Sequence, residues 1–224
     1  MTMKKAMIAM ALACVLLASC LTSFAEENIE SNQSLDVAAF EELLIATVDL
    51  TQYEQTSSSE LHADHTLDKA VMEADVNGWT LKLGMSFDEV ISAGFEAPEG
   101  FTDQEAHERL STSSTFLTPD GKKVSLGFTG KDGDKLANGI LCGIGRDYWA
   151  KNNQADVSID GISVGSDLAT LVKVMGEPRI LCDNGSNLKM RYEYSDDVII
   201  ESVTFYISFD GKVQGLGLGG SFKN

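Results

Sequence analysis

Apolar residues recur with two different periods along this chain, and each period predicts its own kind of element. A helical period occurs first, with Ser34 placed before it as a candidate N-cap, at the residues Leu35, Ala39, Leu43, Ala46 and Leu50. This spacing predicts a helix over most of 36–53. Residues 60–75 form a second, weaker helical candidate that ends before the turn pair Asn77-Gly78. The alternative for both segments is a mobile leader.

One pattern of apolar, glycine and polar residues occurs twice at a constant offset of 81 residues, in Leu83–Ile91 and in Val164–Val172. Each copy opens with a short apolar strand and a glycine that can turn the chain. A polar cap and apolar residues at helical spacing follow. Each helix then meets a glycine and a proline, which end it, in Gly94–Pro98 and in Gly176–Pro178. The repetition predicts an internal duplication.

Segments of β type with hairpin turns follow each helix. The expected strands lie in 115–117, 124–128 and 136–144 after the first helix, and in 179–182, 189–194, 198–209 and 213–218 after the second. The predicted fold class is therefore α+β, with two tandem units of a helix plus an antiparallel sheet. We expect the first unit in 77–150 and the second in 156–224, behind a polar tether and helical leader in 26–76.

The order of apolar strand, glycine, capped helix, Gly-x-Pro exit and strands resembles the β-lactamase-inhibitor-protein-like superfamily. It is also similar to small outer-membrane assembly lipoproteins of the SmpA/OmlA type. The resemblance covers 78–220 and is best at Val164-Gly165-Ser166 and Met175-Gly176-Glu177-Pro178. It implies an exported protein that binds other proteins through the concave face of its sheet. Such motifs belong to the scaffold, so they indicate fold more than function.

The N-terminus has the pattern of a bacterial export signal. Lys4 and Lys5 precede the apolar run Ala6–Leu17, which is too short for a membrane-spanning helix. Two cleavage sites remain open. Cleavage before Cys20, in a lipobox-like Leu-Ala-Ser-Cys, would give a signal in 1–19 and a lipid anchor on Cys20. Cleavage after Ala25 would give a signal in 1–25 and a secreted protein.

The formal net charge of −17 excludes one class of function and favours a kind of partner. Nucleic-acid binding depends on Lys and Arg that neutralise phosphates, so we expect none. Contact with a membrane is expected only through a lipid on Cys20. A protein partner fits better, and the acidic charge favours a basic one. With 43% hydrophobic residues, the chain can bury a core.

Two cysteines lie outside the predicted signal, Cys142 and Cys182. In an oxidising exterior such a pair usually forms a disulfide, and two buried free thiols are the alternative.

Few residues indicate chemistry. His62 and His65 would share one helix face and Asp64 could add an oxygen, but solvated surface histidines explain this segment better. Acids at hairpin turns could bind Ca²⁺, yet no EF-hand loop continues from them. A literal G-x-G-x-x-G lies too near the C-terminus to precede a helix. The turn acids and the glycines are Asp132, Asp134, Asp196, Asp197, Gly215, Gly217 and Gly220.

We therefore expect no enzyme activity, no cofactor, no metal and no catalytic residue. The candidate interface residues are Trp79, Tyr148 and Trp149, because aromatic side chains often anchor protein interfaces. Their alternative role is packing within the protein. The function predicted is a non-enzymatic binding module at the cell envelope or outside the cell. A structural or accessory envelope lipoprotein is the alternative, followed by a hydrolase.

Overall fold

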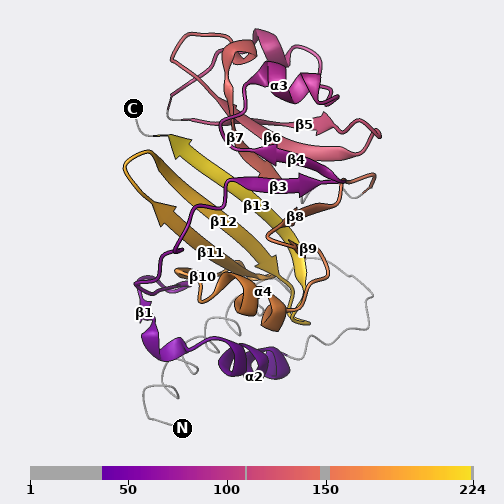
Figure 1. Ribbon diagram of the computed structural model, residues 1–224. Helices are drawn as coiled ribbons and strands as arrows, with labels where there is room; N and C mark the ends of the chain where they lie inside the picture. The colour runs from indigo at the N-terminus through magenta and orange to yellow at the C-terminus, as the bar shows by residue number, and fades with distance from the viewer. Residues whose placement is uncertain (1–36, 109, 147–151, 223–224) are drawn as a thin grey trace, which may run out of the picture. The chain divides into compact units, whose positions relative to one another are not determined.

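The computed structural model describes residues 37–108, 110–146 and 152–222 (Figure 1). The predicted export signal, with both of its cleavage sites, lies outside these residues. The described chain is a mixed α+β protein in which strand residues outnumber helical ones, at 42% against 18%, so sheet pairing dominates the fold. Within the described ranges, no helix is long and apolar enough to span a membrane.

The described helices and strands, most of which are labelled in Figure 1, follow one another along the chain. They are α2 (Val37–Thr47), η1 (Leu50–Gln52), β1 (Glu54–Gln55), β2 (Glu60–His62), β3 (Glu73–Val76), β4 (Trp79–Lys82), α3 (Phe87–Ser92), η2 (Phe101–Asp103), β5 (Thr112–Leu117), β6 (Lys123–Thr129), η3 (Leu136–Asn138), β7 (Ile140–Gly145), β8 (Val157–Ile159), β9 (Ile162–Ser163), α4 (Leu168–Met175), β10 (Ile180–Asp183), β11 (Leu188–Ser195), β12 (Ile199–Ile207) and β13 (Val213–Phe222).

The strands belong to two sheets. The larger has the order β1-β2-β10-β11-β12-β13-β7-β6-β5, and the smaller has the order β4-β3-β8-β9. Pairs such as β10 with β11 and β5 with β6 are antiparallel, as the hairpin turns between them require.

Two compact units can be distinguished, and each draws on several stretches of the chain. Unit 1 contains the described residues up to Leu67, then Gly165–Glu193 and Thr204–Gln214. Unit 2 contains Asp68–Val164, Tyr194–Val203 and the described residues from Gly215 onward. These compact units are defined by contacts in space and not by similarity in sequence. The two repeats expected in 77–150 and 156–224 therefore stay a prediction.

Helices α2 and α4 cover one face of the strands in unit 1. On α4, Leu168, Leu171 and Met175 are buried, as their spacing of three and four residues requires for a single helix face. Phe40 of α2 packs edge-to-face on Phe209, with ring centroids 5.4 Å apart. Alternate residues of β11 and of the part of β12 that belongs to unit 1 complete this core, among them Met190, Tyr192, Phe205 and Ile207. Burial of these apolar side chains stabilises unit 1.

An aromatic cluster forms the centre of unit 2. Phe87 of α3, Phe101 of η2, Phe116 of β5 and Phe128 of β6 are buried, with ring centroids 5.0 to 6.4 Å apart. Most of these pairs meet edge to face, the geometry that aromatic quadrupoles favour.

The glycine turn and the helix predicted for the repeated pattern are confirmed in both copies, and the side-chain cap is confirmed only in the first. Gly84 and Gly165 have φ of 90° and 92°, values that favour glycine. Ser86 caps α3 and Asp167 occupies the N-cap of α4. Strands follow both helices as expected.

A hairpin precedes each copy of the repeated pattern. Its turn was predicted in the first copy and not in the second. β3 and β4 join through Asn77-Gly78, and β8 and β9 join through Asp160-Gly161. All four residues have positive φ, between 49° and 87°, as in type I′ hairpin turns. The same local order of hairpin, glycine, helix and strands thus occurs twice.

The predicted leader is partly wrong. The first helix is confirmed, as α2 followed by η1. The second helical candidate, 60–75, instead contains β2 and β3. The reason is visible at Leu61, which is buried and lies opposite Leu181 of β10, while its neighbours Glu60 and His62 are half-buried. Burial therefore alternates with a period of two, as in a strand. Pairing with the distant strand β10 stabilises this conformation more than the weak helical spacing stabilises a helix.

Candidate functional site

Of the three residues predicted as interface candidates, Trp79 lies in the part of the chain that the structure describes. Tyr148 and Trp149 lie outside the described residues, as does Cys20, the candidate for lipidation. Trp79 is half-buried in β4 of unit 2, where it packs edge-to-face on Phe95 with ring centroids 6.4 Å apart. This contact supports the packing role for Trp79.

Cys142 and Cys182 are both free thiols, so the bridge predicted between them is not formed. They lie on β7 and β10, which are not neighbours in the strand order. Each sulfur has partners of its own: Cys142 Sγ is 3.4 Å from Gly127 O, and Cys182 Sγ is 3.6 Å from Asn184 Oδ1. Burial raises the pKa of Cys142 to about 11 and also raises the pKa of Cys182, with Glu60 adding to the second shift. Neither thiol is activated as a nucleophile.

Several of the histidines and turn acids that were considered as metal ligands pack or form hydrogen bonds within the protein. His62 lies on strand β2 and His65 follows it, so no helix face unites them, and the His65 ring packs on Tyr53 at 6.0 Å. Asp196 accepts the backbone N–H groups of Val198 and Ile199 within its turn, and Asp132 accepts the backbone N–H of Glu108 from another loop. Among the residues that the structure describes, no group of three or more His, Cys, Asp or Glu could hold a metal ion. Gly215, Gly217 and Gly220 lie in β13.

The sheet of unit 1 has a second face, opposite the helices. Leu61, Leu181, Met190 and Tyr192 point into the core, so the residues between them point the other way. We call this surface the open face. Its members are half-buried, and they are Glu60 and His62 of β2, Ile180 and Cys182 of β10, and Lys189, Arg191 and Glu193 of β11.

Strand register arranges the open face in rows. Ile180 lies opposite both His62 and Arg191, which places these three side chains in one row across β2, β10 and β11. The second row is Glu60, Cys182 and Lys189. Cross-strand neighbours of this kind are close enough to interact, so the register brings together residues more than a hundred positions apart.

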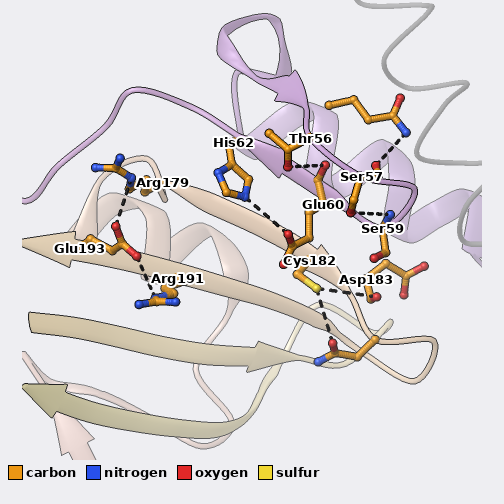
Figure 2. A network of polar contacts seen from close by, with 12 residues as sticks. Thr56, Ser57, Ser59, Glu60, His62, Arg179, Cys182, Asp183, Arg191 and Glu193 are labelled. Carbon is orange, nitrogen blue, oxygen red and sulfur yellow. Dashed lines mark hydrogen bonds and ion pairs between the residues drawn. The ribbon is translucent and has the colours of Figure 1, made fainter. Parts of the chain in front are cut away.

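A shared carboxylate dominates the basic part of the open face. Arg179, just before β10, and Arg191 lie on either side of Glu193 (Figure 2). Arg179 Nε is 3.1 Å from Glu193 Oε2, and Arg191 Nε is 3.0 Å from Glu193 Oε1. The arginine side chains are 37% and 38% exposed and Glu193 is 23% exposed, so the group is held at the surface without being closed off.

The acidic part of the open face lies on β2. Glu60 Oε2 is 3.6 Å from His62 Nε2, in the ion-pair range once the imidazole is protonated (Figure 2). Glu54 of the edge strand β1 lies opposite His62 and adds a further carboxylate on this side. The surface is therefore acidic at β1 and β2 and basic at β10 and β11.

Sequence reasoning missed this surface for one reason. Segment 189–194 was expected as a strand, and its polar-apolar alternation does assign Lys189, Arg191 and Glu193 to a single face. The row partners on β2 could not be found, because 60–75 was expected to be helical.

Unit 2 contains a separate cleft of about 460 Å³. Its lining includes Glu108, Thr129, Lys131, Asp134, Ile140 and Phe222. The charged members, Glu108, Lys131 and Asp134, are exposed and no ion pair joins them to one another. The open face of unit 1, where fixed ion pairs orient the charged groups, is the better candidate.

Comparisons with protein-family models, with curated proteins and with solved structures found no match to this chain.

Proposed function

We propose that this chain is a non-enzymatic binding module that takes a protein partner on the open face of unit 1. The supporting observation is the face itself, where three neighbouring strands present half-buried polar side chains in register. Helices cover the opposite side, so the open face is the side of this sheet available to another molecule.

The chemistry of the open face suits recognition better than catalysis. Arginine is enriched at the centre of protein interfaces, and two arginines here are oriented by one carboxylate. The sulfur of Cys182 has a raised pKa and neighbours a carboxylate rather than a base. Such a thiol is a packing group and a weak hydrogen-bond donor.

The family resemblance supports the same proposal. The order of strand, glycine, helix and further strands that occurs twice is the order expected for β-lactamase-inhibitor-protein-like units. Proteins of that superfamily bind partners through a sheet face, which is the type of surface proposed here.

The proposed location is the cell envelope or the exterior, from the export pattern that ends at Cys20 or Ala25. The net charge favours a basic partner at long range. At contact distance, however, the local charge of the open face decides what binds.

Site-specific photo-crosslinking tests the proposal. The photoreactive amino acid p-benzoylphenylalanine replaces Ile180, in the middle of the open face, and irradiation is carried out in the cells that make the protein. Val174, which is 48% exposed on α4, is the matched control position. We expect a discrete protein adduct from position 180 and none from position 174, detected by electrophoresis and identified by mass spectrometry. Equal adducts from both positions, or none from position 180, would contradict the proposal.

A further inference from the structure

We propose that the open face binds an acidic segment of the partner protein, whose carboxylates lie against Arg179 and Arg191. This inference rests on the proposed function and specifies the chemistry of the partner. It reverses, for this one surface, the expectation of a basic partner that the net charge suggests.

The two guanidinium groups are only partly used within the protein. Each arginine contacts Glu193 through Nε. Within the described ranges of the chain, the terminal nitrogens of both groups have no hydrogen-bond or ion-pair partner. A guanidinium presents five N–H donors in a planar fork that matches a carboxylate. Each arginine can therefore bind a further carboxylate while it keeps its contact with Glu193.

Glu193 prepares the arginines for this role. A long cationic side chain loses conformational freedom when it binds a ligand, and that loss weakens binding. Here the contacts of 3.0 and 3.1 Å hold both side chains before any ligand arrives. Glu193, at 23% exposed, is more buried than either arginine, so the carboxylate is the less mobile partner of both contacts.

The local charge favours an anion. Arg179 and Arg191 share one carboxylate, Glu193, while Lys189 faces Glu60 across Cys182 in the second row. The arginine end of the open face is therefore positive in a chain with a net charge of −17. An acidic segment is repelled by the remainder of the molecule, but ions screen that repulsion beyond a Debye length of roughly 8 Å at physiological salt. At contact distance, charge-assisted hydrogen bonds between the arginines and the carboxylates of the segment determine the affinity.

Ile180 defines a second property of the segment. It lies between His62 and Arg191 in the row that crosses three strands, and it is half-buried. A segment that places an apolar side chain next to its carboxylates would cover Ile180. We therefore infer a partner segment that combines Asp or Glu with apolar residues, rather than a free polyanion.

Titration calorimetry of the full chain with a synthetic peptide tests this inference. The probe is a ten-residue peptide of alternating Glu and Val, and the control peptide has Gln in place of every Glu. At about 0.15 M salt, we expect the Glu peptide to bind the native chain about tenfold more tightly, or more, than the Gln peptide. Equal affinities for the two peptides would overturn the inference.

Matched variants assign the binding to the arginines. The double change Arg179→Gln and Arg191→Gln should weaken binding of the Glu peptide about tenfold or more. The double change Lys131→Gln and Lys173→Gln removes the same charge at exposed positions elsewhere and should change the affinity less than about twofold. Comparable weakening by both pairs would show that total charge, and not this surface, controls binding.

Conservative variants separate fork geometry from charge and from misfolding. Arg179→Lys with Arg191→Lys keeps both charges and the contact region, but a lysine cannot bind a carboxylate in bidentate fashion. We expect this pair to lose affinity several-fold relative to the native chain. Native affinity in the lysine pair would overturn the bidentate recognition proposed here.

Two other occupants of the open face are distinguishable. The residues Glu26, Glu27 and Glu30 precede α2 and are themselves acidic. If changing all three to Gln in the full chain strengthens peptide binding about tenfold, the chain's own segment occupies the face and a partner segment is excluded. A dimer in sedimentation that the Arg179→Gln and Arg191→Gln pair dissolves would assign the face to a second copy.

The failure of this inference differs from the failure of the proposed function. If the Glu peptide does not bind but position 180 still crosslinks a protein, the acidic segment is wrong and the binding module stands. If the crosslink at position 180 is absent as well, both the acidic segment and the binding module are wrong.

Discussion

A carboxylic acid is enclosed in the interior of unit 2. Glu201 of β12 is fully buried. Its Oε1 accepts one hydrogen bond, from the backbone N–H of Val71 at 3.0 Å, and its Oε2 has no hydrogen-bond partner. Burial raises the pKa of Glu201 from 4.5 to about 7; Asp160 raises it further, and the Val71 bond opposes the shift. The side chain is therefore protonated in the folded protein under mildly acidic conditions.

This carboxyl group predicts that stability falls as the pH rises. The folded state holds the proton more tightly than the unfolded chain, because its pKa of about 7 exceeds the ordinary value of 4.5. The contribution of Glu201 to the free energy of unfolding is largest below pH 4.5, decreases up to pH 7 and is constant above that. The total decrease is about 3 kcal/mol.

Urea denaturation at pH 5 and pH 8 measures this decrease. We expect Glu201→Gln to lose most of it, because the amide does not ionise, and to be more stable than the native chain at pH 8. Glu99→Gln, at an exposed loop position, is the control and should keep the native difference. The explanation fails if Glu201→Gln shows the native pH dependence.

The face of Glu201 could be read from the sequence, but the carboxyl group there could not be interpreted. β12 alternates, and Glu201 shares its face with the apolar, buried residues Ile199, Val203 and Phe205. A period of two therefore assigns Glu201 to the core side of the strand. Its hydrogen-bond partner there, the backbone N–H of Val71, lies 130 residues away and has no local sequence signal.

At the scale of elements, the two repeated helices begin differently. Ser86 Oγ accepts the Glu89 N–H and Glu89 Oε2 accepts the Ser86 N–H, so α3 has a complete capping box. Asp167 occupies the same place before α4 but makes no side-chain cap. Its carboxylate is bound to Lys212 instead.

This difference predicts unequal effects of alanine at the two N-caps. Ser86→Ala should lower the free energy of unfolding by about 1 kcal/mol, because the Glu89 N–H loses the hydroxyl oxygen that accepts it. Asp167→Ala should lower it less, because only an exposed ion pair is lost. Thermal unfolding followed by circular dichroism compares the two variants. Equal losses would show that the cap geometry does not control the stability of these helices.

Elements built from local signals could be predicted, and those completed by distant partners could not. The turns, the capped helices and the hairpin strands follow from glycine, cap and alternation patterns within about ten residues. β2 is three residues long and exists because Leu61 pairs with Leu181 of β10. The open face depends on this pairing, so the same cause that hid β2 also hid the candidate site.

At the scale of the molecule, the compartment predicted for the chain does not determine the state of its cysteines. Two cysteines outside a predicted export signal suggested a disulfide between Cys142 and Cys182, with free thiols as the alternative, and both thiols are free in the structure. A bridge needs Cα atoms within roughly 7 Å, and a pair of cysteines in a sequence carries no information about that distance. Cys142 belongs to unit 2 and Cys182 to unit 1.

The export proposal makes its own prediction for the mature chain. Mass spectrometry of protein isolated from the producing cells should find one of two N-termini. A lipidated Cys20 would place the module at a membrane surface, and an unmodified Glu26 would make it a secreted protein. An intact Met1 in the mature protein would contradict export by either route.

The interleaving of the two units along the chain determines when each can form. Phe40 and its packing partner Phe209 lie near opposite ends of the described chain, and the last strand, β13, supplies residues to both units. A ribosome must therefore release nearly the whole polypeptide before either core can close. No single cut separates the two units into two complete fragments, so neither unit should be produced as one half of a divided chain without residues of the other.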